Sequence, residues 1–267
     1  MIALFFGRVC RLLACAAVVW LAAANAVAEL EKRTWLVDGV EREALVSVPA
    51  QAAKAAAPLV FVFHGHGGAM AQAARSFQLQ TLWPEALVVY PQGLPTPGKL
   101  TDPEGKRAGW QAQAGAQGDR DLKFFDVMLA DLQKTQRVDE KRIYATGHSN
   151  GGAFTYQLWA ERGTVFAAVA PSAALYVPGA GKLTPKPVLH VGSPDDELVK
   201  FSWQERMIER VFAVNGAGAR DPSVRGYRLY PGKDGMDVAL LIHPGGHRFS
   251  PEAPARIVEF FKAHAQR

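Results

Sequence analysis

The sequence predicts an α/β fold built on a mostly parallel sheet, and three observations support this. Apolar runs of strand length alternate with segments of helical periodicity from residue 58 to the end of the chain. These apolar runs are continuous rather than alternating with polar residues, which is typical of strands covered by helices on both faces. Hydrophobic residues make up 49% of the 267 residues, so a substantial core can be buried.

The first half of the chain contains a predicted edge hairpin and two predicted central strands. Thr34–Pro49 has Asp38-Gly39 between two alternating runs, which indicates a β-hairpin at an antiparallel edge of the sheet. The continuous apolar runs Pro58–Gly65 and Ala86–Pro91 predict central strands. Residues 92–120 are rich in Gly, Pro, Asp and Gln and are expected to form an irregular loop.

The second half of the chain continues the alternation. Asp121–Gln136 has apolar residues at helical spacing, with Asp121 as the expected N-cap. Gly216 is expected to close a later helix. No linker interrupts the pattern, so residues 29–267 are interpreted as a single domain. Further strands are expected at 141–147, 166–171, 187–193, 225–231 and 237–244, and further helices at 151–162, 203–216 and 254–265.

Residues 1–28 have the layout of a secretory signal peptide. Arg8 and Arg11 precede the apolar run Leu12–Ala24, and small residues at Ala26–Ala28 fit a cleavage site. The apolar run is short for a membrane span, which disfavours an uncleaved anchor. A lipoprotein-like site at Leu12–Cys15 is disfavoured because the apolar run continues beyond it. We therefore expect an exported protein, either secreted or periplasmic.

Cleavage after Ala28 would restrict the chemistry of the mature chain. Both cysteines of the sequence, Cys10 and Cys15, would be removed, which excludes cysteine nucleophiles, cysteine zinc sites and disulfide bonds. The formal net charge would fall from +5 to +3 with the loss of Arg8 and Arg11. So small a charge does not indicate a nucleic acid partner.

A serine lies between glycines where a predicted strand becomes a predicted helix. Gly147-His148-Ser149-Asn150-Gly151 fits the pattern G-x-S-x-G of a nucleophile elbow. The sharp turn strains the backbone at the serine, and the flanking glycines avoid crowding by side chains. Ser149 is therefore the expected nucleophile, and the alternative is an incidental serine in a glycine-rich turn.

A serine hydroxyl needs a base, and in this kind of site the chain order is serine, acid, histidine. His190 lies inside an apolar strand and is interpreted as a core histidine, while His243 ends a strand and His264 lies in the last helix. His247 lies in the loop between the last strand and the last helix, from which a base can reach back over the sheet. We therefore expect His247 to be the base.

The expected acid lies in the loop after the strand at 187–193. That loop offers Asp195, Asp196 and Glu197, one of which should accept the imidazole N–H. The spacing alone does not choose among the three carboxylates.

An oxyanion hole requires two backbone N–H groups. The residue after the nucleophile, Asn150, is one expected donor. The glycine-rich segment Phe63–Gly68 follows the first central strand, and His66 N–H is the second expected donor.

No metal or other cofactor is expected. His64 and His66 are two residues apart and no acidic cluster accompanies them. His243 and His247 are four residues apart, but Pro244-Gly245-Gly246 prevents the helix that a zinc motif requires.

Four segments also resemble those of a known family. VFHGHGG (62–68), YATGHSNGG (144–152), DDELVKF (195–201) and GGH (245–247) occur in the order seen in the esterase family that includes polyhydroxybutyrate depolymerases and feruloyl or acetylxylan esterases. The chain is similar to this family over roughly residues 33–263. Members are α/β-hydrolases, so the resemblance implies that fold, with helices on both faces of a twisted sheet.

The resemblance also implies roles for individual residues. It implies a serine esterase with Ser149 as nucleophile, His247 as base and His66 as an oxyanion donor. In relatives the acid stands five residues before an aromatic residue, which points to Asp196 and leaves Asp195 as the alternative. The chain departs from polymer-degrading members because no second domain or lipase-like lid is visible, so short or soluble esters are the expected substrates.

Two loops are expected to shape the substrate pocket. Residues 92–120 leave the carboxyl end of a strand, where Trp110 either stacks on an aromatic acid or sugar or anchors the loop by packing. Residues 172–185, with Tyr176, are expected to form a second wall.

Two other functions are compatible with the predicted fold. One is a serine peptidase on the same fold, and the other is a non-catalytic protein that binds a carbohydrate or polymer. Candidates for every member of a catalytic triad disfavour the second alternative. The sequence leaves the oligomeric state open.

Overall fold

The computed structural model describes residues 29–179 and 181–266. The predicted signal peptide at residues 1–28 lies outside the described residues. Within the described part of the chain, no helix is long and apolar enough to cross a membrane.

Nine strands of the described chain form one sheet in the order β1-β2-β4-β3-β7-β8-β9-β11-β10. A separate two-stranded ribbon pairs β5 (Leu94–Pro95) with β6 (Ala108–Gly109) inside the 92–120 loop. The strands of the main sheet are β1 (Leu30–Val37), β2 (Val40–Ser47), β3 (Ala57–Phe63), β4 (Leu87–Pro91), β7 (Val138–His148), β8 (Ala168–Ser172), β9 (Val188–Gly192), β10 (Gly226–Tyr230) and β11 (Val238–Ile242).

The prediction of a mostly parallel sheet with an N-terminal antiparallel hairpin is confirmed. Strands β4, β3, β7, β8, β9 and β11 pair in parallel, whereas β1 and β2 form the hairpin predicted around Asp38-Gly39. Strand β10 adds a second antiparallel edge, which was not predicted. The short link between β10 and β11 explains it, because a parallel pairing needs a long crossover connection.

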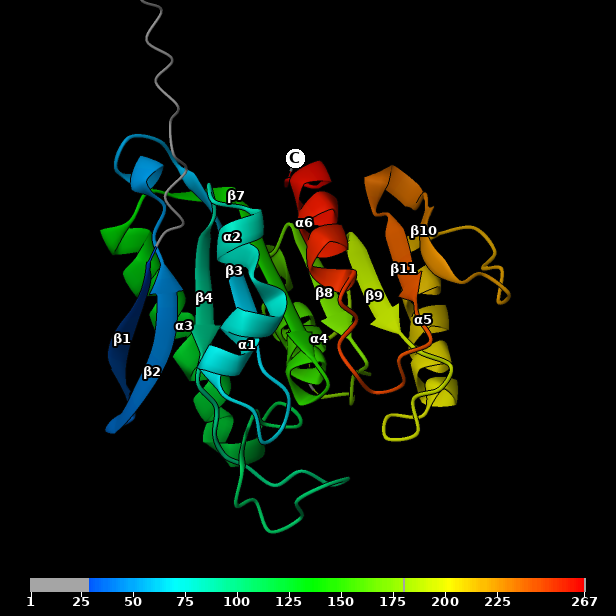
Figure 1. The fold of residues 1–267 in the computed structure, drawn as a ribbon, viewed down its shortest axis with the longest axis horizontal. Coiled ribbons are helices and arrows are strands. Elements are labelled where there is room, and N and C mark those ends of the chain that lie inside the picture. Colours follow the sequence, from blue (N-terminus) through cyan, green and yellow to red (C-terminus); the bar gives the residue numbers. More distant parts are fainter. Residues whose placement is uncertain (1–28, 180, 267) are drawn as a thin grey trace, which may run out of the picture.

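Helices cover both faces of the sheet (Figure 1). One face carries α1, α2 and α6, and the other carries α3, α4 and α5, so each face has its own buried hydrophobic cluster. The sequence did not predict α1 or α2, because segments of eight and four residues are too short to show a helical period. The helices are α1 (Met70–Phe77), α2 (Leu79–Leu82), α3 (Arg120–Thr135), α4 (Asn150–Glu161), α5 (Phe201–Asn215) and α6 (Ala253–Ala263).

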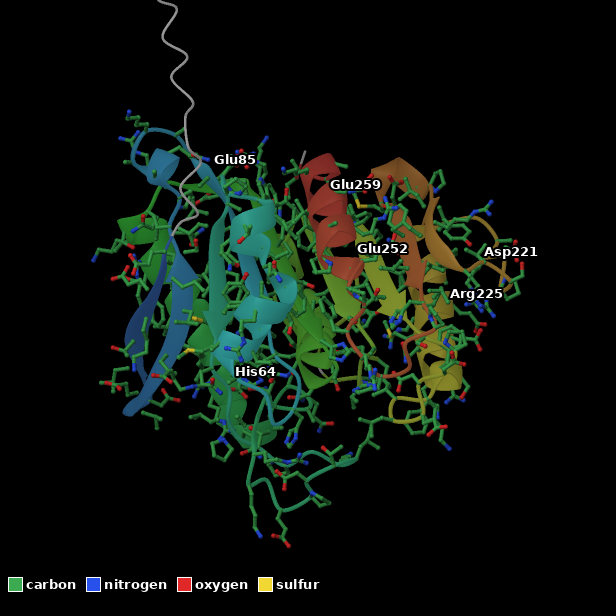
Figure 2. All side chains as sticks on the ribbon, viewed as in Figure 1. His64, Glu85, Asp221, Arg225, Glu252 and Glu259 are labelled. Atoms are coloured by element: carbon green, nitrogen blue, oxygen red, sulfur yellow. The ribbon has the colours of Figure 1, made fainter. Side chains whose placement is uncertain are left out.

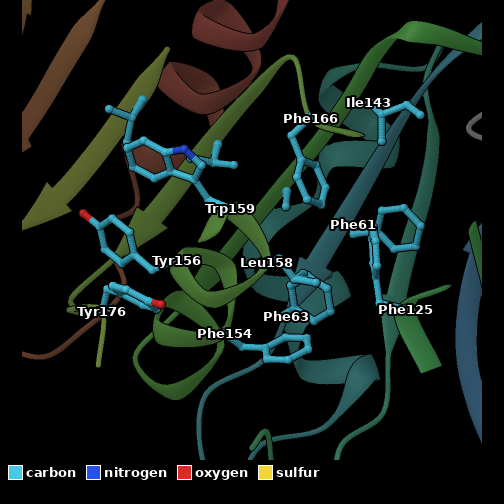
Figure 3. Packing of buried hydrophobic residues seen from close by; sticks show 14 of the residues in the cluster. Phe61, Phe63, Phe125, Ile143, Phe154, Tyr156, Leu158, Trp159, Phe166 and Tyr176 are labelled. Carbon is cyan, nitrogen blue, oxygen red and sulfur yellow. The ribbon is translucent and has the colours of Figure 1, made fainter. Parts of the chain in front are cut away.

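Aromatic side chains fill the layer between β3 and the helices α3 and α4 (Figure 3). Phe61 meets Phe125 edge-on with ring centroids 4.9 Å apart, and Phe63 meets Phe154 in the same way at 5.0 Å. All four rings are almost completely buried. Since α4 begins directly after Ser149, this packing fixes the helix that supports the elbow.

Asp121 is not the N-cap of α3, so that prediction is wrong. Asp119 holds the N-cap position and makes no side-chain capping hydrogen bond. Asp121 is the second residue of the helix, and its buried carboxylate pairs with the buried guanidinium of Arg42 at 2.8 Å. Tertiary pairing with the hairpin has determined the role of this carboxylate.

The carboxyl ends of the parallel strands gather at one edge of the sheet. In Figure 1 the arrowheads of β8 and β9 point to the lower edge, and the teal loop after β4 extends below it. Figure 2 shows His64 at this edge, directly after β3. Ligand sites of open parallel sheets form outside this edge.

Candidate active site

Ser149 lies on a strained turn between β7 and α4. Its φ is 57° and its ψ is −120°, a backbone conformation that residues other than glycine rarely adopt. The Ser149 N–H donates to the Ser172 carbonyl at 2.8 Å, which ties the turn to the end of β8. A Cβ atom at Gly147 would lie 2.5 Å from the Gly151 carbonyl oxygen, and one at Gly151 would overlap the Phe63 carbonyl. Both glycines are therefore required for this turn to pack against β3.

Ser149, His247 and Asp196 are hydrogen-bonded in series. His247 Nε2 lies 2.8 Å from Ser149 Oγ, and His247 Nδ1 lies 2.9 Å from Asp196 Oδ2 and 3.1 Å from Oδ1. The carboxylate accepts the Nδ1 proton, so Nε2 is left as the acceptor for the serine hydroxyl. The Asp196 side chain is fully buried, whereas the His247 side chain is 24% exposed.

Asp195 lies in a different environment from Asp196. It is exposed, and its backbone N–H donates to Ser193 Oγ at 3.2 Å. Among the hydrogen bonds of the described residues, none joins Asp195 to His247. The geometry therefore favours Asp196 over Asp195 as the acid.

His148 is hydrogen-bonded to the loop that carries His247. Its Nε2 donates to the His247 backbone carbonyl at 2.9 Å, and its Nδ1 accepts from Ser172 Oγ at 3.1 Å. Burial, followed by the proximity of His247, lowers the pKa of His148 to about 4. The ring therefore stays neutral and keeps one donor and one acceptor. The motif predicts no role for His148, because the x positions of G-x-S-x-G can be any residue.

The two predicted oxyanion donors lie beside Ser149. Asn150 is the first residue of α4, and the first N–H groups of a helix have no partner within it. Gly67 and Gly68 donate their N–H groups to backbone carbonyls, whereas no protein acceptor for His66 N–H is found within the described ranges. A Cβ atom at Gly65 would lie 3.5 Å from Ser149 Cβ, so this loop closely approaches the nucleophile.

Trp110 does not present its ring to a ligand, which corrects its predicted role as a substrate-binding residue. It is 1% exposed and stacks on Phe154 with centroids 5.4 Å apart. Its indole N–H donates to the His64 carbonyl at 2.9 Å, and its backbone N–H and C=O both pair with the Asn150 side chain, at 2.7 and 3.1 Å. Trp110 is instead a packing anchor for its loop, the alternative role that the sequence allowed. Each of its polar groups is hydrogen-bonded to His64 or Asn150.

Tyr176 is likewise turned away from the nucleophile, so its predicted place in the pocket wall is corrected. It is 4% exposed, and its hydroxyl donates to the Gly181 carbonyl and accepts the Gly179 N–H, both at 3.1 Å. Its neighbours Leu175 and Val177 line the cavity instead. Alternate residues of an extended segment point to opposite sides, so Leu175 and Val177 face the cavity and Tyr176, between them, faces away from it.

A cavity opens beside Ser149 and is lined mostly by apolar side chains. Two of its walls come from the loops predicted to shape the pocket. A third wall, with Trp203, comes from the segment after Asp196 and was missed, although an aromatic residue so near the predicted acid was a usable signal. The lining residues are His66, Pro97, Gly98, Lys99, Leu100, Thr101, Ala112, Ser149, Asn150, Ala153, Ala173, Ala174, Leu175, Val177, Leu198, Val199 and Trp203.

Comparisons with known proteins agree with this architecture. The model of the prolyl oligopeptidase family matches residues 110–206. An acetyl xylan esterase from Aspergillus awamori of known structure superposes with a TM-score of 0.62 at 14% identity, covering 87% of this chain and 99% of that chain. This likeness over 87% of the chain identifies the fold.

The chain has the α/β-hydrolase fold.

Curated relatives confirm the resemblance to feruloyl and acetylxylan esterases. A bifunctional acetylxylan esterase/xylanase of Neocallimastix patriciarum is 29% identical over 159 residues, covering 57% of this chain and 21% of the relative. Feruloyl esterase D of Neurospora crassa is 28% identical over 176 residues, covering 60% of this chain and 59% of the relative. The chain thus spans about a fifth and about three fifths of the length of these two relatives.

The imidazole rings of His64 and His66 are hydrogen-bonded to the backbone. His64 Nε2 accepts the Gly93 N–H at 2.9 Å and its Nδ1 lies 2.7 Å from the Gly65 carbonyl, so both ring nitrogens are bound to backbone. His66 Nε2 donates to the Thr96 carbonyl at 2.8 Å. Across residues 29–179 and 181–266, no three His, Cys, Asp or Glu side chains converge as a metal site.

Proposed function

We propose that this α/β-hydrolase is an exported serine esterase that hydrolyses short or soluble carboxylic esters through an acyl-enzyme. The observation that carries the proposal is the Ser149 hydroxyl, held 2.8 Å from His247 Nε2 with the buried Asp196 carboxylate behind the imidazole. The strained elbow and the two backbone donors beside it support the same conclusion. Residues 1–28 would direct export.

Acylation begins when Ser149 Oγ attacks the ester carbonyl carbon. His247 Nε2 takes the hydroxyl proton as the new C–O bond forms, and Asp196 stabilises the resulting imidazolium. The His66 and Asn150 N–H groups donate to the developing oxyanion. When the tetrahedral intermediate collapses, the bond to the alcohol breaks and the leaving oxygen takes the proton from His247.

Deacylation repeats these steps with water in place of the alcohol. His247 removes a proton from a water molecule, whose oxygen attacks the acyl carbon. Collapse of the second intermediate breaks the bond to Ser149 Oγ, which recovers its proton from the imidazolium. The carboxylic acid then leaves the cavity.

The cavity lining limits the substrate class. Leu175, Leu198 and Trp203 are among its apolar walls, which suits an acyl group or alcohol without charge. The relatives are named for feruloyl and acetylxylan esters, so aromatic and acetyl acyl groups are the first candidates. An oligomer of 3-hydroxybutyrate remains a third candidate from the motif resemblance.

A substrate panel tests the proposal. We expect the chain without residues 1–28 to hydrolyse at least one of p-nitrophenyl acetate, butyrate, octanoate, methyl ferulate and a 3-hydroxybutyrate trimer. Ser149→Ala should reduce kcat by about 10⁶-fold without unfolding the protein, because no nucleophile then remains beside His247. Circular dichroism of both proteins provides the folding control.

Two results would contradict the proposal. Equal activity in Ser149→Ala would remove the serine from the mechanism. A folded wild-type protein that is inactive on every ester would exclude the esterase function.

A serine peptidase is the second candidate, because the prolyl oligopeptidase model matches the segment that contains Ser149 and Asp196. Peptidyl p-nitroanilides in the same panel separate the two functions. Turnover of anilides but not of esters, again dependent on Ser149, would favour the peptidase.

A further inference from the structure

A series of buried hydrogen bonds continues behind Asp196 into the core. Gln204 Nε2 on α5 lies 3.0 Å from Asp196 Oδ2. Gln204 Oε1 lies 3.3 Å from His190 Nε2 on β9, and His190 Nδ1 lies 2.7 Å from the Tyr156 hydroxyl on α4. The side chains of Gln204, His190 and Tyr156 are completely buried.

The direction of every proton in this series is determined by its ends. Gln204 Nε2 faces two acceptors, the Asp196 carboxylate and the Val199 carbonyl at 2.7 Å, so the amide nitrogen must lie on this side. The amide oxygen then accepts from His190 Nε2–H, which leaves His190 Nδ1 to accept the Tyr156 hydroxyl proton. The protons therefore point from Tyr156 through His190 and Gln204 to Asp196.

Four donors hold the Asp196 carboxylate in place. Besides His247 and Gln204, the Leu198 and Val199 backbone N–H groups donate to Oδ1 at 3.0 and 2.8 Å. Gln204 and His247 both donate to Oδ2, at 3.0 and 2.9 Å. Rotation of the carboxylate would break these two bonds together.

Gln204 and His190 pack closely against the backbone of β9 at Gly192. A Cβ atom at Gly192 would lie 2.8 Å from Gln204 Oε1 and 3.3 Å from His190 Nε2. Figure 3 shows Tyr156 with its hydroxyl directed away from α4, on the side of β9. Side chains from α4, β9 and α5 thus form one series that ends at the acid.

We propose that Gln204, His190 and Tyr156 are positioning residues that hold Asp196, and through it His247, in the geometry for general base catalysis. The inference rests on the proposed function, because the positioned group is the base of that mechanism. None of the three side chains lines the cavity beside Ser149. Their loss should therefore lower kcat and leave KM unchanged.

Gln204→Met tests the proposal, because it keeps similar volume and removes the amide. We expect kcat on the best ester of the panel to fall about tenfold to 100-fold, the range expected when a catalytic group is misplaced by about 1 Å. Gln157→Met is the matched control. Gln157 is also a buried glutamine, 1% exposed, but its amide atoms have no hydrogen-bond partner among the described residues, so the kcat of this variant should stay at the wild-type value. A folded Gln204→Met protein with wild-type kcat would overturn the proposal, as would an equal loss in Gln157→Met.

Tyr156→Phe provides a second test if Gln204→Met does not fold, because it removes only the hydroxyl at the far end. We expect the His190 ¹⁵N resonances to shift and kcat to fall several-fold at constant KM. An unchanged kcat together with an unchanged His190 tautomer would contradict the proposal.

Nuclear magnetic resonance separates a failure of this inference from a failure of the proposed function. The proton on His247 Nδ1 reports its bond to Asp196 whether or not any ester is hydrolysed. We expect its resonance to move in Gln204→Met and to stay in Gln157→Met. The same resonance in all three proteins would overturn the inference.

Discussion

Asp195 and Asp196 are neighbours in the chain, but the backbone places them in opposite surroundings. Asp196 is 4% exposed and hydrogen-bonded to His247, whereas Asp195 is exposed. A carboxylate contributes to catalysis only where it can orient the imidazole and stabilise its charged form. The difference between the two residues is therefore one of position rather than of chemistry.

Asp196→Asn and Asp195→Asn measure this difference. Asn at 196 should reduce kcat by about 10⁴-fold, because the amide no longer favours the tautomer with a free Nε2. Asn at 195 should leave kcat near the wild-type value. The measurement is kcat of each variant on the same ester, and the reverse order of activities would assign the acid to Asp195.

Trp110 shows why a single residue was ambiguous in the sequence. An aromatic residue in a polar loop is compatible with both a binding face and a packing anchor. Its indole N–H, backbone and ring all contact the scaffold, at His64, Asn150 and Phe154. These contacts involve segments far apart in the chain, so no local pattern could have shown them.

At the scale of elements, the hairpin β1–β2 is joined to α3 by the buried pair Arg42–Asp121. Both side chains are almost inaccessible, and Arg42 also lies 4.3 Å from the centre of the Phe124 ring. Asp121 in turn accepts the Gln111 N–H at 2.8 Å, in the segment next to Trp110. This pair therefore links the edge of the sheet to the loop that supports the oxyanion donors.

Arg42→Met should lower the free energy of unfolding by about 3 kcal/mol, because it leaves the buried Asp121 carboxylate with only the more distant Arg120 guanidinium, at 3.9 Å. Lys32→Met is the control on the neighbouring strand. Lys32 pairs with Glu43 on the surface, so its loss should cost less than about 1 kcal/mol. Urea denaturation of both variants measures the difference, and equal destabilisation would contradict a special role for the buried pair.

At the scale of the whole molecule, buried neutral histidines make stability depend on pH. Burial lowers the pKa of His190 to about 4, against 6.5 for an exposed histidine. Between these values the unfolded chain binds a proton at this site and the folded chain does not, so stability rises with pH. The contribution is present above pH 6.5 and is lost as the pH falls towards 4.

We therefore expect the free energy of unfolding to decrease from pH 6.5 to pH 4, with His190 contributing up to about 3 kcal/mol. His190→Gln should reduce the slope over this interval, whatever its effect on stability at pH 7. Chemical denaturation of both proteins at several pH values measures the slopes. Parallel curves would show that another group causes the loss.

The antiparallel β10 and the short helices α1 and α2 mark the limit of prediction at the scale of elements. Strands such as β3 were predictable because continuous burial on two faces demands a continuous apolar run. Strand β10 alternates weakly and is half exposed at an edge, so its direction depends on its neighbour β11. The prediction that Asp121 is an N-cap was wrong for a similar reason, because Arg42, which is distant in the chain, pairs with that carboxylate.

The sequence by itself determined what depends on neighbours in the chain. It determined the central strands, the hairpin, the serine turn with its glycines, and the chain order of serine, acid and histidine. Only the tertiary structure gave Asp195 and Asp196 different surroundings, turned Trp110 and Tyr176 away from the cavity, and brought Gln204, His190 and Tyr156 together behind Asp196. The physical reason is that local patterns record backbone conformation and burial, whereas hydrogen bonds between distant segments depend on where the packed elements place each side chain.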